Sequence, residues 1–151
     1  MDESRLEIPI LIKLIAEASE RDVNRQMKDQ EVTATQARAL GYLSYANQPI
    51  PEKKLEKALH ISQPSTAGLV HRLQDRGLIA TSPCPDDGRS TLVALTEKGS
   101  RKVSETREAV GRTQKLLERD FSEEEKEAIR TYLSKMLRTL QEEEARNASD
   151  K

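Results

Sequence analysis

The pattern of apolar and polar positions predicts a mainly helical chain. In six stretches, apolar residues recur at steps of three and four, the spacing that places them on one face of an α-helix. The last stretch ends at Leu140, beyond which the chain turns polar, and we expect it to fray there. The six predicted helices span about 10–28, 34–46, 51–60, 62–76, 97–120 and 123–140.

The stretch from Ile61 to Ile79 is the one around which the others are arranged. Ser62 can cap a helix, because its hydroxyl oxygen can accept a backbone N–H left unpaired at the helix start. Pro64 falls in the first turn, where no N–H is needed, and Gly77 can take the positive φ that ends a helix. The inward positions are Thr66, Leu69, Val70 and Leu73, and the opposite face carries Gln63, Ser65, Gly68, His71 and Arg72.

Such a helix, with small hydrogen-bonding residues at its N-terminal end, suits insertion into a DNA major groove. An ordinary amphipathic helix whose polar face meets only water would have the same pattern. The preceding segment favours the first interpretation. It predicts another short helix over Pro51–His60, and only His60 and Ile61 separate that helix from the Ser62 cap. Two short helices joined so tightly indicate a helix-turn-helix.

The segment after Gly77 predicts a wing. Two runs of β-branched and aliphatic residues, Leu78–Thr81 and Thr91–Leu95, flank a loop of proline, aspartate and glycine, which is typical of a β-hairpin. Arg89 would lie at its tip and could enter a DNA minor groove. It could also be a solvated loop residue held by Asp87, and both interpretations can hold at once. The fold class is therefore mainly α with a small β-hairpin wing.

The flanking helices have their own start signals. Thr33 and Gln36 form a capping box, as do Ser122 and Glu125, and Thr96 can cap the helix over 97–120. Apolar residues at seven-residue spacing in that long helix suggest packing against another long helix. This heptad consists of Val103, Val110 and Leu117, and the last helix carries a stripe of Ile129, Leu133, Met136, Leu137 and Leu140.

Composition and charge narrow the class of protein without naming a partner. The chain has 151 residues, 34% charged and 35% hydrophobic, with no run of about 18 apolar residues. We therefore expect a soluble, cytoplasmic protein. The net charge of −1 does not announce a nucleic-acid binder, but the charges are unevenly placed. Segment 51–95 has six basic and five acidic residues, and segment 118–151 has seven basic and ten acidic residues.

The usual signatures of catalysis and metal binding are missing from the sequence. One cysteine excludes an internal disulfide framework, and that cysteine and the two histidines are too far apart in sequence to indicate a metal site. There is no glycine-rich phosphate loop and no nucleophile–base pairing. We expect no enzyme, no metal and no cofactor. Cys84, between two prolines on the predicted wing, is either an inert loop thiol or a redox sensor.

The order of these elements resembles the MarR family of bacterial winged-helix transcription regulators. The match is densest from Thr33 to Gly99 and covers nearly the whole chain. It rests on Thr33–Gln36, on LEKALHIS before the recognition helix, on LVHRLQDRGLI, on Asp87-Gly88-Arg89-Ser90 in the wing and on Leu95-Thr96-Glu97-Lys98-Gly99. Two positions depart from the family: Gly68 stands where many relatives have a longer polar residue, and His60 occupies a turn position often held by glycine.

The resemblance implies a homodimer that binds a pseudo-palindromic operator in double-stranded DNA, most often as a repressor. Segments 1–31 and 97–151 would form dimerisation helices around a winged helix-turn-helix lobe over 32–96. Asp87 would support the wing arginine. The DNA-binding positions that the resemblance implies are Ser62, Gln63, Pro64, Ser65, Gly68, His71, Arg72, Arg89 and Ser90.

Many such regulators are released from DNA by a small molecule, often an aromatic acid. The candidates for such a site are Lys13, Tyr42 and Tyr45. The main alternative to DNA binding is a winged-helix module that docks another protein, since winged helices also serve that purpose.

Overall fold

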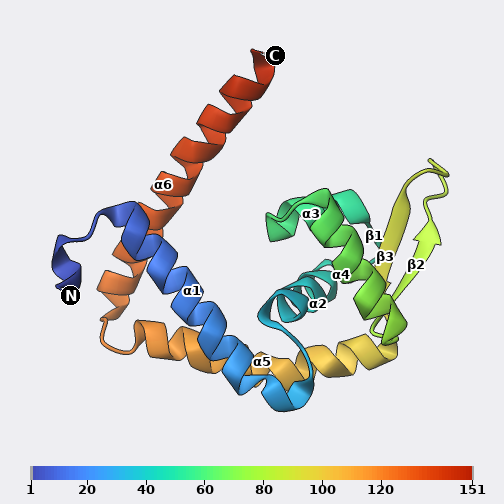
Figure 1. Ribbon diagram of the computed structural model, residues 1–151, viewed down its shortest axis with the longest axis horizontal. Coiled ribbons are helices and arrows are strands. Elements are labelled where there is room, and N and C mark those ends of the chain that lie inside the picture. Colours follow the sequence, from blue (N-terminus) through green and yellow to red (C-terminus); the bar gives the residue numbers. More distant parts are fainter. Residues whose placement is uncertain (1, 151) are drawn as a thin grey trace. The chain divides into compact units, whose positions relative to one another are not determined.

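The computed structural model describes residues 2–150, and the chain divides between Thr113 and Gln114 into two compact units (Figure 1). The first unit holds everything up to the greater part of α5, and the second holds the end of α5 and α6. The elements are η1 (Glu3–Arg5), α1 (Ile8–Gln26), η2 (Lys28–Gln30), α2 (Ala34–Ala46), β1 (Ile50–Pro51), α3 (Glu52–Leu59), α4 (Gln63–Asp75), β2 (Ile79–Pro83), β3 (Thr91–Leu95), α5 (Glu97–Glu118) and α6 (Glu123–Ser149).

The mainly helical fold with a small wing is confirmed, and so are the local start signals. Both capping boxes form, at Thr33 with Gln36 and at Ser122 with Glu125. The first predicted helix is shifted by two residues, because Pro9 lies within its first two positions. His60 takes the left-handed conformation, with φ 53° and ψ 42°, that glycine often provides in this turn. Histidine is one of the side chains that tolerates this region.

The sheet has one strand more than the predicted hairpin. β3 lies in the middle, antiparallel to β2 on one side and to the two-residue β1 on the other. In β1, Ile50 lies opposite Val93 and Pro51 opposite Leu92. The hairpin extends beyond helices α3 and α4 (Figure 1). Because α3 begins directly after Pro51, which lies opposite Leu92, β1 holds the start of α3 beside the wing strand β3.

The main core joins α2, α3, α4, the sheet and the start of α5. The predicted inward stripe of α4 is confirmed, since all four of its positions are buried. Arg38 of α2 adds a polar tie, its Nη2 donating to the Leu59 carbonyl at 3.0 Å. This bond satisfies one of the carbonyls left unpaired at the end of α3. The core residues include Leu40, Leu43, Ile50, Leu55, Leu69, Leu73, Leu78, Ile79 and Val93.

The junctions on either side of the hairpin are hydrogen-bonded to each other. The Thr96 hydroxyl donates to the Gly77 carbonyl at 2.6 Å and accepts the Gly99 N–H at 3.1 Å, so Thr96 caps α5 as predicted. Gly77, with φ 72°, ends α4. Gly99 packs so closely against the Leu78 carbonyl that a Cβ added to Gly99 would overlap the oxygen.

In α5, Val103 is buried, but Val110 and Leu117 are 43% and 50% exposed. The packing of this heptad against another long helix therefore stays a prediction. A stripe of smaller residues lies inward, and at its start Gly99 packs against the Leu78 carbonyl with no room for a side chain. That stripe consists of Gly99, Val103, Thr106, Ala109 and Thr113.

The expected fraying after Leu140 is also wrong, since α6 continues to Ser149. Glutamate, alanine and arginine are strong helix formers, and Arg146 pairs with Glu143 at 2.8 Å. The apolar stripe of α6 is present, but α6 has no buried residue. The polar tail therefore extends the helix without needing a core.

A second, smaller cluster links α1 to α5 within the first unit. Met27, Val32, Ala37 and Ala109 form its apolar part. Beside it, the Thr113 hydroxyl donates to Asp22 Oδ2 at 2.7 Å, and Gln26 Nε2 donates to the same oxygen at 2.6 Å. The Thr113 hydrogen bond, together with those from Gln26 and Arg25, lowers the pKa of the Asp22 carboxyl below its ordinary value.

Replacing Gly99 by alanine should destabilise the protein, because the new methyl group meets backbone that cannot move away. Overpacking of this kind costs about 1–3 kcal/mol. Gly111→Ala in the same helix is the matched control: a Cβ there has no neighbour within 4 Å, and alanine is the better helix former by about 0.5–1 kcal/mol. Urea unfolding of both variants measures the difference, and equal stabilities would contradict this role of Gly99.

The Asp22 cluster should make stability depend on pH in the acid range. Because the folded-state pKa is lowered, the cluster stabilises the fold above the pKa of the unfolded chain, and this contribution is lost as the pH falls through the folded-state pKa. Asp22→Asn should therefore lower the unfolding midpoint at pH 7, and its deficit should shrink toward pH 3. Asp29→Asn, an exposed carboxyl in η2, is the control. A deficit that stays constant with pH would exclude the ionised carboxylate as its cause.

Candidate nucleic-acid interface

Hydrogen bonds among residues of its own first turn cap α4 at the N-terminal end, as predicted. The Ser62 hydroxyl accepts the Ser65 backbone N–H at 3.2 Å, and the Thr66 hydroxyl donates to the Ser62 carbonyl at 2.9 Å. The Ser62 hydroxyl also donates to the Ser65 hydroxyl at 2.8 Å. Pro64 lies in the first turn. These contacts leave Gln63 exposed at the tip of the helix, with its side-chain amide free of partners among residues 2–150.

The side chains on the outer face of α4 are not all extended. An added Cβ on Gly68 would lie 3.2 Å from Nη1 of Arg72, so the Arg72 guanidinium lies back over Gly68, one turn earlier. His71 Nε2 lies 3.3 Å from Asp75 Oδ2, and both side chains are well exposed. Gly68 therefore gives Arg72 room to fold back, and His71 has a local carboxylate partner.

The wing loop is organised by Asp87. Its Oδ1 accepts the Arg89 backbone N–H at 2.9 Å and its Oδ2 accepts the Ser90 hydroxyl at 3.0 Å. Cys84, which is half-buried, donates its backbone N–H to the Ser90 carbonyl at 2.9 Å. Asp87 thus shapes the loop backbone rather than holding the Arg89 guanidinium. That guanidinium is exposed and has no ion-pair partner within the described part of the chain.

Two hollows border α4, one on each side. The first, about 460 Å³, lies between the start of α3, the tip of α4 and the wing, and we call it the wing hollow. It brings Gln63 together with Arg89 and Ser90, three of the predicted DNA-binding residues. Lys53 also lines it, with Glu52 and Glu56 on the same wall.

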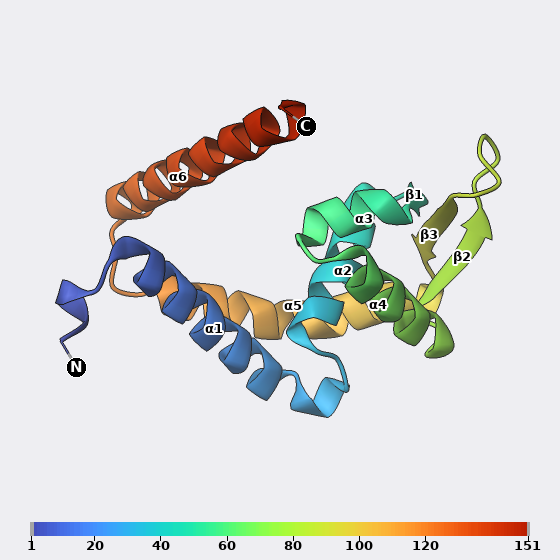
Figure 2. The ribbon, with the colours of Figure 1, turned by 45° about the horizontal axis from the view of Figure 1, so that its top comes forward.

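The second hollow, about 420 Å³, lies on the α2 side of α4, and we call it the Arg72 hollow. Arg72 and Ser65 contribute from α4, Thr33, Thr35 and Gln36 from the start of α2, and Glu20 and Asn24 from α1. Figure 2 shows the end of α1 passing into the start of α2 near α4. Cations thus line both hollows beside α4. Arg89 and Lys53 line the wing hollow, and Arg72 lines the Arg72 hollow.

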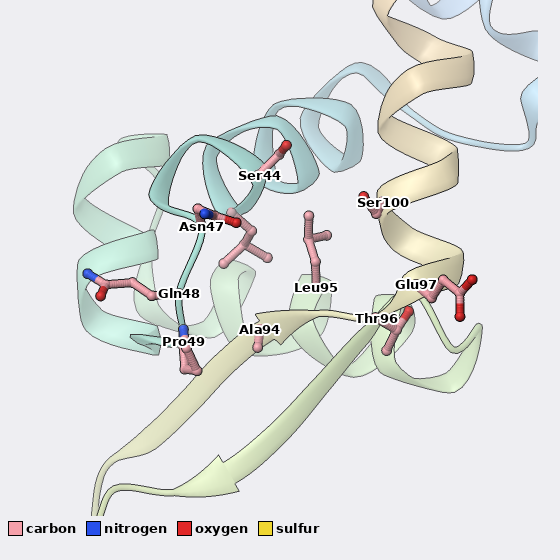
Figure 3. Close-up of a pocket in the computed structure, with 10 residues that line it drawn as sticks. Ser44, Asn47, Gln48, Pro49, Ala94, Leu95, Thr96, Glu97 and Ser100 are labelled. Carbon is pink, nitrogen blue, oxygen red and sulfur yellow. The ribbon is translucent and has the colours of Figure 1, made fainter.

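A third hollow, also about 420 Å³, has a different chemistry (Figure 3). It lies between the end of α2 and the junction of β3 with α5. Ser44, Asn47 and Gln48 line one side of it, and Leu95 and Ser100 line the other. Its single charged residue is Glu97, so it has nothing that would attract an anion.

The structure does not gather the predicted ligand residues. Lys13 pairs with Glu17 on α1 at 3.8 Å, Tyr42 packs partly against the main core, and Tyr45 is 88% exposed. None of the three lines any hollow described above. Across residues 2–150, no three side chains of His, Cys, Asp or Glu are grouped to hold a metal ion. Over the same residues, no helix is long and apolar enough to cross a membrane.

Sequence reasoning missed Lys53 and Thr35 as candidate site residues. Lys53 reaches the wing hollow because β1 pairs with β3, and a two-residue strand leaves no periodic signal. Thr35 was visible only as part of a helix start. The one available signal was that Thr35 follows a capped N-terminus, where backbone N–H groups attract anions.

The sequence and fold of this chain are similar to those of known proteins. Residues 30–90 match the family model described as MarR family. S. aureus MepR in its DNA complex is 26% identical, with a TM-score of 0.83 over 89% of this chain and 99% of that one. A probable transcriptional regulator from Pseudomonas aeruginosa is also 26% identical, with a TM-score of 0.77 over 86% and 96% of the two chains.

A mutant of E. coli MarR, solved with operator DNA, shares the fold at 24% identity, with a TM-score of 0.80 over 89% of this chain and 96% of that one. The winged lobe matches the family model, and the fold of these regulators extends along most of the sequence. Over residues 30–90, the chain is therefore similar to the MarR family.

Proposed function

We propose that this protein is a transcriptional regulator that binds duplex DNA with α4 in a major groove and the hairpin tip in the adjoining minor groove. The observation that carries the proposal is the wing hollow, which Gln63 of α4 and Arg89 of the wing both line although they are far apart in sequence. A neutral amide that can read a base edge and a free guanidinium that can contact phosphate or a narrow groove are the two kinds of contact such an interface needs.

The solved relatives support the same use of the fold. MepR of S. aureus and a mutant of E. coli MarR were both solved in complex with DNA, and this chain is similar to each over 89% of its length. The expected DNA-binding residues on α4 and the wing are exposed or half-buried, so they are available to a duplex. If no duplex binds, the alternative function, a winged-helix module that docks another protein, is favoured.

The proposal includes a homodimer with segments 1–31 and 97–151 as dimerisation helices around the lobe over 32–96. The support lies in apolar side chains that the single chain leaves uncovered. On α1 these are Ile8, Ile10, Ile12, Leu14 and Ile15, and on α6 they are Ile129, Leu133, Met136, Leu137 and Leu140, all at least 36% exposed. Exposed apolar surface on this scale is typical of an interface.

A two-fold dimer would read a pseudo-palindromic site, and occupancy of a promoter would make it a repressor. Selection of bound sequences from random duplex DNA tests the whole proposal. We expect enriched sites with two inverted half-sites about one helical turn apart. Absence of any enriched sequence, with no binding to any duplex in dilute salt, would contradict DNA binding.

Arg89→Ala should weaken binding to every duplex, because the guanidinium lacks a protein partner and contributes mainly through charge. We expect the slope of log affinity against log salt to become shallower by about one per subunit. Gln63→Ala should instead change which selected sequences are preferred and leave the slope alone. Electrophoretic shift or anisotropy titrations at several salt concentrations measure both. A change of sequence preference in Arg89→Ala with no change of slope would assign Arg89 to base reading instead.

Leu137→Glu on the apolar stripe of α6 should turn the dimer into a monomer, because it places a charge in the interface. Duplex affinity should fall by at least tenfold, since a monomer engages only one half-site. Thr131→Glu adds the same charge to the opposite face of α6 and is the control. Sedimentation velocity gives the oligomeric state of each. A dimer that survives Leu137→Glu would exclude this stripe from the interface.

A further inference from the structure

The Arg72 hollow is lined by several hydrogen-bond donors, and reading of base edges by α4 does not explain their grouping. We propose that it binds one backbone phosphate of the duplex, at the edge of the groove that α4 enters. Arg72 would then be a phosphate contact rather than the base-reading residue that its place on the recognition helix suggested. The inference rests on the proposed function, since the phosphate is delivered by the duplex that α4 reads.

The first support is the position of the guanidinium. Arg72 lies back over Gly68 and lines the hollow beside Thr35, instead of extending away from the tip of α4. It has no ion-pair or hydrogen-bond partner within the described part of the chain. A longer side chain at position 68 would occupy the space that the guanidinium uses. The glycine that departs from the family pattern therefore explains where Arg72 lies.

The second support is the side-chain amide of Gln36, whose nitrogen is not used within the described part of the protein. Gln36 is only 9% exposed, and its Oε1 accepts the Thr33 backbone N–H at 3.1 Å in the capping box. That bond fixes which end of the amide is oxygen. The amide nitrogen donates to no atom in residues 2–150, while Gln36 lines the hollow. The nitrogen is not one of the buried atoms without a partner, so water can reach it, and a phosphate oxygen in the hollow could replace that water.

The hydroxyl groups around the hollow add donors of the same kind. Thr33 uses its oxygen to accept the Gln36 backbone N–H at 3.1 Å, and Ser65 accepts the Ser62 hydroxyl at 2.8 Å. In both, the hydroxyl hydrogen stays free to rotate toward a ligand. Thr35 lies in the first turn of the 13-residue helix α2, where the helix dipole also favours negative charge. Phosphate oxygens match this set because they only accept.

Glu20 decides between a duplex phosphate and a free anion. Its carboxylate lines the same hollow and offsets the charge of Arg72, so a small anion in solution would gain little net attraction. A phosphate held on a duplex that α4 already grips is presented at high effective concentration and can use the donors despite Glu20. The hollow is therefore suited to a phosphate that arrives with a larger ligand.

The experiment compares Arg72→Gln, Glu20→Gln and Arg107→Gln in the full-length protein. Arg107 is an exposed cation on α5 that lines none of the hollows, so its variant is the control for loss of one charge. Titrations use a selected duplex and an unrelated duplex at several salt concentrations. We expect Arg72→Gln to weaken both by a similar factor, about tenfold, and to make the salt slope shallower by about one per subunit. Glu20→Gln should tighten both.

Three results would overturn the proposal. One is a change of sequence preference in Arg72→Gln with an unchanged salt slope, which would make Arg72 a base contact. Another is an Arg72→Gln variant that binds as tightly as Arg107→Gln. The third is a free-anion site: inorganic phosphate, against potassium chloride of matched ionic strength, raises the thermal midpoint of the wild type but not of Arg72→Gln, while duplex affinity is unaffected by the substitution.

The proposed function and this inference fail in distinguishable ways. Duplex binding by the wild type that Arg89→Ala weakens and Arg72→Gln does not would remove only the phosphate site. A wild-type protein that binds no duplex at any salt concentration would overturn both.

Discussion

The lobe depends on one close approach, that of the first turn of α5 to the backbone that leaves α4. Gly99 packs directly on the Leu78 carbonyl, and Thr96 bridges the two junctions by donating to Gly77 and accepting from Gly99. Lys98 adds a bond from its Nζ to the Arg76 carbonyl at 2.8 Å. Because each of these contacts involves a backbone group at the junction, together they fix where α4 ends and where the wing strands meet α5.

This close approach also sets which elements lie on each side of α4. With the base of the hairpin fixed, β3 can pair with β1, and β1 brings the start of α3 to the wing. With the end of α4 fixed, its N-terminal half lies beside α2, whose own start is held by the Thr33–Gln36 capping box. These contacts thus position the elements that carry Arg89 and Arg72, and neither guanidinium has a hydrogen-bond or ion-pair partner within residues 2–150.

The polar residues of α4 and the wing fall into two groups. Some use their side chains in hydrogen bonds to the nearby backbone, and others have side chains that remain free to bind a ligand. Ser62, Asp87 and Arg38 use their side chains on nearby backbone groups, so they shape the helix-turn-helix and wing. Gln63, Arg89 and the amide nitrogen of Gln36 have no such partner in the described residues. Water can hydrate these groups in the free protein, so they are available to a ligand that displaces it. The interface can therefore be recognised from the unpaired donors rather than from net charge.

The sequence by itself determined the helices, their caps, the turn at Gly77 and the hairpin, because each depends on residues within about one turn of one another. The inward face of α4 was likewise readable from spacing alone. Only the tertiary structure decided the third strand and the inward stripe of α5. It also decided that Arg72 lies beside the start of α2, since that depends on how α4 packs against α2. Contacts between distant segments leave no periodic trace in the chain, and that is the physical reason for the division.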